Sequence, residues 1–206
     1  RREALTRRQR QLERLRSVPA TSRDKIRISL QCNLELPYEL ALAQQVGAEG
    51  VGLLRSEFLY MNRDTLPSED EQYVAFKEIV EGMGGHPVTV RTLDVGSDKL
   101  AYSLGEHISP SANPALGLRA IRLSLKVRKL LETQLAAMLR ASAHGELRIL
   151  LPMINSAGEI KLVQEAMDKV VRRLTRKRVA MSDPLPKLGI MIETPGAALA
   201  ADSLAK

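Results

Sequence analysis

The sequence predicts an α/β fold of the (β/α)₈ TIM barrel type, with only about the first five βα units present in its 206 residues. Strand-like apolar runs alternate with amphipathic helical segments about five times, and no hairpin signal joins two strands. Alternation of this kind is typical of a parallel sheet covered by helices. A complete barrel takes roughly 250 residues, so we expect a partial barrel rather than a closed one.

Five strands are expected from runs that are rich in β-branched and aliphatic residues. They span residues 26–34, 50–58, 88–94, 147–153 and 188–193. An open, doubly wound sheet is the competing fold. A nucleotide-binding sheet of that kind would carry G-x-G-x-x-G after its first strand or a Walker A motif, and the sequence has neither.

Helices are expected between these strands, and their first residues carry recognisable signals. They span residues 37–46, 68 to about 82, 116–125, 126–142, 156–179 and 196–205. Pro37 lies in the first turn of the first helix, where proline is well tolerated. Ser68 and Glu71 have the spacing of a capping box. Ser156 and Glu159 repeat that spacing before the long helix that follows the fourth strand.

The first 20 residues differ in character from the rest of the chain. Leu5, Leu12 and Leu15 give only a thin apolar stripe among charged residues, so we expect an exposed helix. A helix this polar is typical of a connection between domains. We therefore interpret residues 1–20 as a linker helix and residues 21–206 as the partial barrel, and we expect both to belong to a longer protein.

Composition narrows the classes of partner. The formal net charge is +7, which could attract nucleic acid. Aromatic residues, however, make up only 3% and tryptophan is absent, so few side chains could stack on nucleobases. We interpret the basic runs as solvated helix faces and expect no nucleic-acid partner. No stretch approaches 18 consecutive apolar residues, so we expect no membrane span. Cys32 is the only cysteine, which fits a reducing cytoplasm.

Three strand-like runs end in a charged residue. The runs close on Arg55, Arg91 and Glu193. A charge that ends a buried strand is costly unless it faces a site, and the ends of parallel strands share one face. Two guanidinium groups suit a small anion with phosphate and carboxylate groups, and a glutamate suits a hard divalent metal. Ordinary ion pairs of the arginines, and a helix cap by the glutamate, remain open alternatives.

Further basic residues flank a long irregular stretch, residues 95–114. Connections of this length inside a compact domain are usually functional. Lys99 lies within the stretch, and Arg119 and Arg122 follow it on one helix face. Asp94 and Asp98 are candidate partners for these cations, and a solvated basic edge is the alternative interpretation.

Several segments, in order, resemble enzyme I of the bacterial phosphotransferase system, the phosphoenolpyruvate (PEP)–protein phosphotransferases. They are GAEGVGLLRSEFLYMNRDTLPSEDEQ, VRTLDVGSDK, NPALGLRAIR, QLAAMLRASAHGELRILLPMI and GIMIETPGAALAA. Pyruvate phosphate dikinase and PEP synthase share the barrel but match the first segment less well. Ser97 departs from the family pattern, where a glycine pair is usual.

The resemblance assigns roles to individual residues. It implies that Arg55, Arg91, Lys99 and Arg119 bind PEP and that Glu193 is one of two Mg²⁺ ligands. It implies no catalytic residue within these 206 residues, because the phosphorylated histidine belongs to an N-terminal domain and the proton-donating cysteine to a later part of the barrel. Residues 1–20 would then be the linker from that histidine domain.

The resemblance also implies partners and an activity. The whole protein would move phosphate from PEP to its own histidine and on to the phosphocarrier protein HPr in sugar uptake, as a homodimer joined through the barrel. The 206 residues alone would be inactive. Two other functions stay open: a barrel of the PEP synthase or pyruvate phosphate dikinase kind, and a non-catalytic dimerisation or regulatory module.

Overall fold

The computed structural model describes residues 11–61, 63–96, 113 and 116–205. Its centre is a parallel sheet with strands in the order β1-β2-β3-β4-β5. The strands are β1 (Cys32–Leu34), β2 (Val51–Arg55), β3 (Val88–Arg91), β4 (Leu147–Leu151) and β5 (Lys187–Ile190). The predicted α/β class and the parallel sheet are confirmed, and sequential strand order is compatible with part of a barrel.

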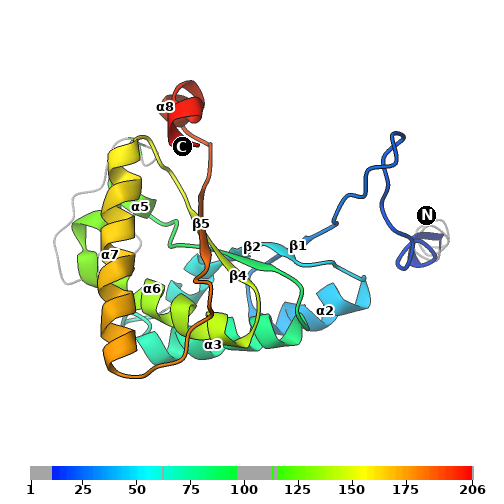
Figure 1. Ribbon diagram of the computed structural model, residues 1–206, viewed down its shortest axis with the longest axis horizontal. Coiled ribbons are helices and arrows are strands. Elements are labelled where there is room, and N and C mark those ends of the chain that lie inside the picture. Colours follow the sequence, from blue (N-terminus) through cyan, green and yellow to red (C-terminus); the bar gives the residue numbers. More distant parts are fainter. Residues whose placement is uncertain (1–10, 62, 97–112, 114–115, 206) are drawn as a thin grey trace.

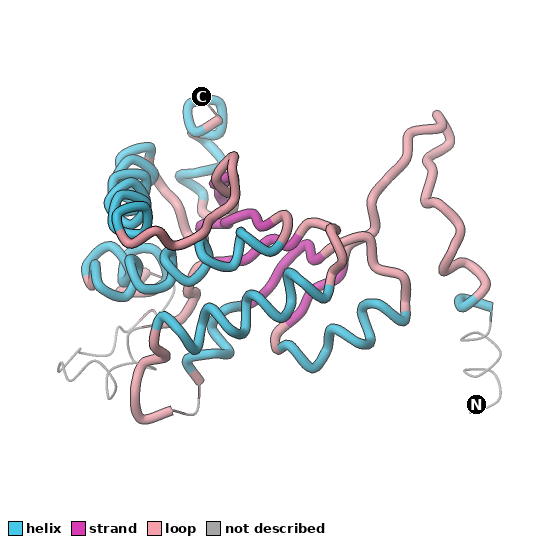
Figure 2. The backbone as a smooth tube through the Cα atoms, turned by 60° about the horizontal axis from the view of Figure 1, so that its bottom comes forward, coloured by secondary structure: helices cyan, strands magenta, loops and turns pink. Residues whose placement is uncertain are grey.

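Helices cover one face of this sheet and follow its strands (Figure 1). The α-helices are α2 (Leu40–Gln45), α3 (Glu69–Gly82), α5 (Ala120–Lys126), α6 (Arg128–Ala141), α7 (Ala157–Arg176), α8 (Pro195–Leu199) and α9 (Ala201–Leu204). Short 3-10 turns are η1 (Pro37–Glu39), η2 (Ser56–Tyr60) and η3 (Ser142–His144). Residues 11–31 lie on the opposite side of the molecule from α7, which Figure 1 labels, and Figure 2 shows the same separation after a turn of the view.

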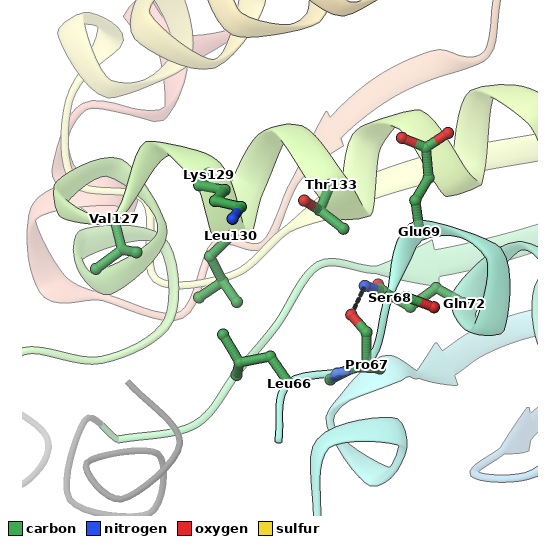
Figure 3. A pocket seen from close by; sticks show the side chains of 9 residues that line it. All are labelled: Leu66, Pro67, Ser68, Glu69, Gln72, Val127, Lys129, Leu130 and Thr133. Carbon is green, nitrogen blue, oxygen red and sulfur yellow. Dashed lines mark hydrogen bonds between the residues drawn. The ribbon is translucent and has the colours of Figure 1, made fainter. Parts of the chain in front are cut away.

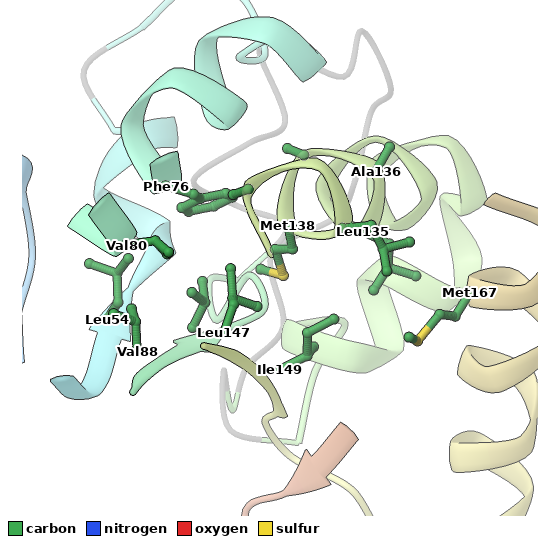
Figure 4. Packing of buried hydrophobic residues seen from close by; sticks show 14 of the residues in the cluster. Leu54, Phe76, Val80, Val88, Leu135, Ala136, Met138, Leu147, Ile149 and Met167 are labelled. Carbon is green, nitrogen blue, oxygen red and sulfur yellow. The ribbon is translucent and has the colours of Figure 1, made fainter. Parts of the chain in front are cut away.

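The main core lies between the sheet and helices α3, α6 and α7. Figure 4 shows side chains from all of these elements in one apolar layer. They include Leu54, Phe76, Val80, Val88, Leu135, Ala136, Met138, Leu147, Ile149 and Met167, all of them buried. Burial of a large aliphatic or aromatic side chain contributes roughly 1.5–3 kcal/mol, so this layer holds the helices against the sheet.

Both predicted capping boxes are present. The hydroxyl of Ser68 accepts a hydrogen bond from the amide of Glu71, and the Glu71 carboxylate accepts one from the amide of Ser68 at 2.8 Å. Ser156 and Glu159 make the same reciprocal pair at the start of α7. These bonds satisfy helix N–H groups that would otherwise lack a partner, which explains why α3 and α7 begin where the sequence predicts.

The α3 capping box makes a prediction about acid stability. The amide of Ser68, the guanidinium of Arg63 and the hydroxyl of Ser68 lower the pKa of Glu71 from 4.5 to about 2. Because the folded pKa is the lower one, the stabilising effect is present above pH 4.5 and is lost as the pH falls toward 2. Glu71→Gln should therefore unfold more easily at pH 7 and show a flatter loss of stability between pH 4.5 and 2, measured by urea unfolding. An unchanged acid slope would contradict this.

Each of the five expected strands is shorter in the structure. The strand expected at residues 26–34 is reduced to Cys32–Leu34, and the preceding Ile26 and Ile28 are exposed. Only the last three residues have partners on β2, because β2 begins at Val51 and, among the described residues, no strand pairs with the other side of β1. The run expected to close on Glu193 ends as a strand at Ile190.

The N-terminal linker helix is described only in part. Residues 11–13 are helical and residues 14–17 form turns, all of them exposed, while residues 1–10 lie outside the described part. The irregular stretch 95–114 also lies outside it except for residues 95, 96 and 113. No helix within the described ranges combines the length and the apolar character needed to cross a membrane.

Candidate functional site

Two arginines end neighbouring strands at the same edge of the sheet. Arg55 is the last residue of β2 and Arg91 the last of β3, and the two are register partners in the parallel pair. We call the edge formed by the carboxyl ends of the five strands the carboxyl edge. The expectation that both arginines lie at one end of the sheet is confirmed by this register.

Arg55 lies at an accessible part of the carboxyl edge. Its Nη1 donates to Oε1 of Glu35 at 2.8 Å, and the two side chains are 40% and 37% exposed. Glu35 follows β1, and its amide is held by the carboxylate of Glu39 at 2.6 Å. An ion pair this solvated contributes little stability. Displacement of the Glu35 carboxylate by an anionic ligand therefore costs little free energy.

Arg91 is held far more tightly. Its Nη2 lies 2.5 Å from Oε1 of Glu57, and its Nη1 lies 3.1 Å from Oδ2 of Asp94. All three side chains are only 11% exposed. The alternative of an ordinary ion pair is thus present for Arg91, which pairs with Asp94 three residues on. Glu57, although closer in sequence to Arg55, also pairs with Arg91. In such a buried pair, removal of one partner leaves the other charge uncompensated.

Asp94 links Arg91 to a second cation. Its Oδ1 accepts from Nη2 of Arg119 at 2.9 Å, so Glu57, Arg91, Asp94 and Arg119 form a chain of alternating charges. We call these four residues the charge chain. It carries no formal net charge, and it brings Arg119 to the carboxyl edge as the sequence predicts. Lys99 lies outside the described residues.

Glu193 follows β5 and is exposed. Its Oε1 accepts a hydrogen bond from the amide of Met153, just beyond β4, at 2.7 Å. It does not cap the next helix, since Thr194 performs that role by accepting from the amide of Ala197. The alternative of a simple helix cap is therefore wrong, and the carboxylate is fixed between the ends of two strands.

The β5 end lies close to Arg91. Nη1 of Arg91 is 4.0 Å from the sulfur of Met191, two residues before Glu193. Glu193 and both arginines thus belong to one edge of the sheet. One carboxylate with substrate oxygens and water is a ligand set that Mg²⁺ accepts. Within the described residues no group of three His, Cys, Asp or Glu side chains is placed to hold a metal ion.

A buried amide fixes the ends of β2 and β3 relative to α6. Gln134 Nε2 donates to the hydroxyl of Ser56 at 3.0 Å, and Gln134 Oε1 accepts from the amide of Leu93 at 2.8 Å. The Ser56 hydroxyl donates to the carbonyl of Arg91 at 2.6 Å. This network holds the turn that carries Glu57 against the strand that carries Arg91.

We expect Gln134→Leu to destabilise the protein by about 2–4 kcal/mol. The leucine would leave the Leu93 amide and the Ser56 hydroxyl short of partners, and each unpaired buried group costs about 1–3 kcal/mol. Urea unfolding of this variant beside Thr133→Ala, a change on the same helix outside the network, measures the difference. Equal stability of the two variants would contradict the assigned role of Gln134.

Unpartnered polar atoms gather at the carboxyl edge. Among the described residues, Nε of Arg91, Nε of Arg119, Oε2 of Glu57 and Oγ1 of Thr92 are buried without a hydrogen-bond partner. The backbone is also strained nearby, because Ala120 has a φ of 50°. Unpaired buried groups and strain of this kind are concentrated at functional sites.

A separate hollow of about 460 Å³ lies outside the carboxyl edge, between the first turns of α3 and α6 (Figure 3). Its wall is mainly apolar, and its charged residues are Glu69 and Lys129. The side-chain amide of Gln72 donates a hydrogen bond to the carbonyl of Pro67 along this wall. The hollow holds a single cation, Lys129, whereas the carboxyl edge gathers the guanidinium groups of Arg55, Arg91 and Arg119, so that edge remains the candidate site.

A family model decides where the chain belongs. The model of the PEP-binding domain of PEP-utilising enzymes matches residues 9–206. The chain belongs to this family. The PEP-binding domain therefore accounts for nearly the whole chain, and the charged residues described above lie within it.

Relatives of this domain include named phosphotransferases. The chain is 48% identical to the phosphoenolpyruvate-protein phosphotransferase of Cupriavidus necator over 91% of this chain and 32% of that protein. It is 45% identical to the protein of the same name from Geobacillus stearothermophilus (89% and 31%) and 40% identical to that from Haemophilus influenzae (95% and 34%). The resemblance to these phosphotransferases is thereby confirmed, and the chain spans about a third of their length.

Proposed function

We propose that this domain binds PEP for a phosphotransferase that moves its phosphate to a histidine of the same protein and then to HPr. The observation that carries the proposal is the register of Arg55 with Arg91 at one end of adjacent parallel strands. Two guanidinium groups at one edge match an anion that carries both a phosphate and a carboxylate. The names of the relatives support the same substrate.

The residues have distinct parts in this proposal. Arg55 and Arg91 bind the phosphate and carboxylate, Lys99 and Arg119 add positive charge, and Glu193 is a ligand of Mg²⁺. Bound Mg²⁺ would neutralise charge on the phosphate oxygens. Phosphoryl transfer spreads charge over those oxygens, and fixed cations stabilise it without covalent work by the domain. The remaining Mg²⁺ ligand, the phosphorylated histidine and the proton-donating cysteine are proposed to lie outside these residues.

The wider setting is part of the same proposal. We propose that the domain belongs to a (β/α)₈ barrel, that residues 1–20 link it to a histidine-bearing domain, and that the protein works in the cytoplasm as a homodimer in sugar uptake. The 206 residues alone are proposed to be inactive, because we place the accepting histidine in the preceding domain. The parallel sheet with strands in sequential order is what such a barrel requires.

The test uses the natural protein that carries these residues. With ³²P-labelled PEP, Mg²⁺ and HPr, label should appear on a histidine of the protein and then on HPr, without ATP. A requirement for ATP with pyruvate would instead favour a PEP synthase or a pyruvate phosphate dikinase. A folded protein that neither binds PEP nor transfers its phosphate would support a dimerisation or regulatory module and would overturn the proposal.

A further inference from the structure

Arg91 and Arg55 share one edge but are held in opposite ways. The Arg55–Glu35 pair is open to water, so the Arg55 side chain can adjust to a ligand. Arg91 is bound at both terminal nitrogens by buried carboxylates, Glu57 on Nη2 and Asp94 on Nη1. A guanidinium held at two points has a fixed plane, and that plane sets the direction of its remaining N–H groups.

Glu57 is the more distant of these two anchors in the sequence. Asp94 lies in the loop that follows β3, three residues after Arg91, whereas Glu57 comes from η2, 34 residues before Arg91. The η2 turn is itself fixed by the Ser56–Gln134 network. Glu57 therefore ties the orientation of Arg91 to the end of β2, where Arg55 lies.

We propose that Glu57 is a positioning residue, which acts on PEP through Arg91 by holding its guanidinium in the orientation used in phosphoryl transfer. This inference rests on the proposed function of the site. Glu57 carries a negative charge beside a site for an anion, which would weaken simple electrostatic attraction. The buried contact between Glu57 and Arg91 therefore orients the guanidinium. Removal of the Glu57 carboxylate should lower the rate of phosphate transfer more than the affinity for PEP.

The first test compares three variants of Glu57 in the natural protein. Glu57→Ala should lower kcat at least about 30-fold while KM for PEP stays within about threefold or falls, because a misplaced group costs rate and a negative charge is removed. Glu57→Gln keeps an acceptor oxygen for Nη2 and should restore most of kcat. Glu57→Asp keeps the charge but withdraws it by one methylene, so its kcat should be lower than that of Glu57→Gln.

The second test asks whether Glu57 acts through Arg91. In an Arg91→Ala background, Glu57→Ala should cause no further loss of kcat/KM, because the group that it positions is absent. Glu146→Ala serves as the matched control, since Glu146 forms an exposed ion pair with Arg148 at the opposite end of β4. The control should leave both kinetic constants unchanged.

A purely structural role would give a different pattern. Glu57→Ala would then lower the melting temperature but leave kcat per folded molecule within threefold of the parent, and that result would overturn the proposal. If Glu57→Ala does not fold, the proposal is tested by comparing kcat of Glu57→Gln with kcat of Glu57→Asp. If both variants have the kcat of the parent protein, the proposal is also overturned. Parental PEP kinetics in Arg91→Ala would instead refute the proposed function itself.

Discussion

Arg91→Ala is expected to lower kcat/KM for PEP by at least about 10³-fold in the natural protein. Arginines that stabilise charge in phosphoryl transfer contribute about 10³–10⁵-fold to the rate. Loss of Arg91 also leaves Glu57 and Asp94 buried without their shared cation. Both effects act against an anion at the site, so KM should rise and kcat should fall.

The control for this variant separates chemistry from folding. Arg91→Lys keeps one positive charge, but an ammonium group lacks the planar fork that contacts both carboxylates. We expect it to fold, as judged by circular dichroism, and still to lose at least about 100-fold in kcat/KM for PEP. Steady-state kinetics within threefold of the parent for a folded Arg91→Lys would contradict the role of the guanidinium.

Glu193→Gln is expected to raise the Mg²⁺ concentration needed for half-maximal phosphate transfer by about tenfold or more. A neutral amide oxygen is a weaker ligand for a hard cation than a carboxylate is. The glutamine can still accept the hydrogen bond from the Met153 amide, so the contact between the ends of β4 and β5 is preserved. The variant should therefore require more Mg²⁺ for activity while its folding stability stays unchanged.

The measurement is a titration of transfer activity with Mg²⁺ at saturating PEP. Glu159→Gln is the control. It also replaces a carboxylate that accepts hydrogen bonds from backbone amides, here at the start of α7, but it removes no proposed metal ligand. That control should lower stability and leave the Mg²⁺ midpoint unchanged. An unaltered Mg²⁺ midpoint in Glu193→Gln would contradict the assignment of Glu193 as a metal ligand.

The positions of Arg55 and Arg91 could be predicted because they depend on two local rules. An apolar run predicts a strand, and alternation with helices makes the strands parallel, so the last residues of neighbouring runs share an edge. The first strand was predicted too long for the same reason. β-branched residues at Ile26 and Ile28 favour an extended chain, but pairing depends on a partner strand that only Cys32–Leu34 meet.

The partners of the arginines could not be predicted from local pattern. Glu57 lies two residues from Arg55, yet it contacts Arg91 because η2 turns the chain after β2. Gln134 looks like any polar residue on a helix, and its bonds to Ser56 and Leu93 span 78 and 41 residues. Such contacts depend on how separate elements pack, and spacing along the chain carries no signal for them.

The most direct measurement is a crystal structure of the natural protein with Mg²⁺ and a non-hydrolysable PEP analogue. We expect the phosphonate and carboxylate within hydrogen-bonding distance of Arg55 and Arg91, with Glu193 on the metal. Binding of the analogue in the hollow between α3 and α6, or at the amino ends of the strands, would contradict the assignment of the carboxyl edge as the PEP site.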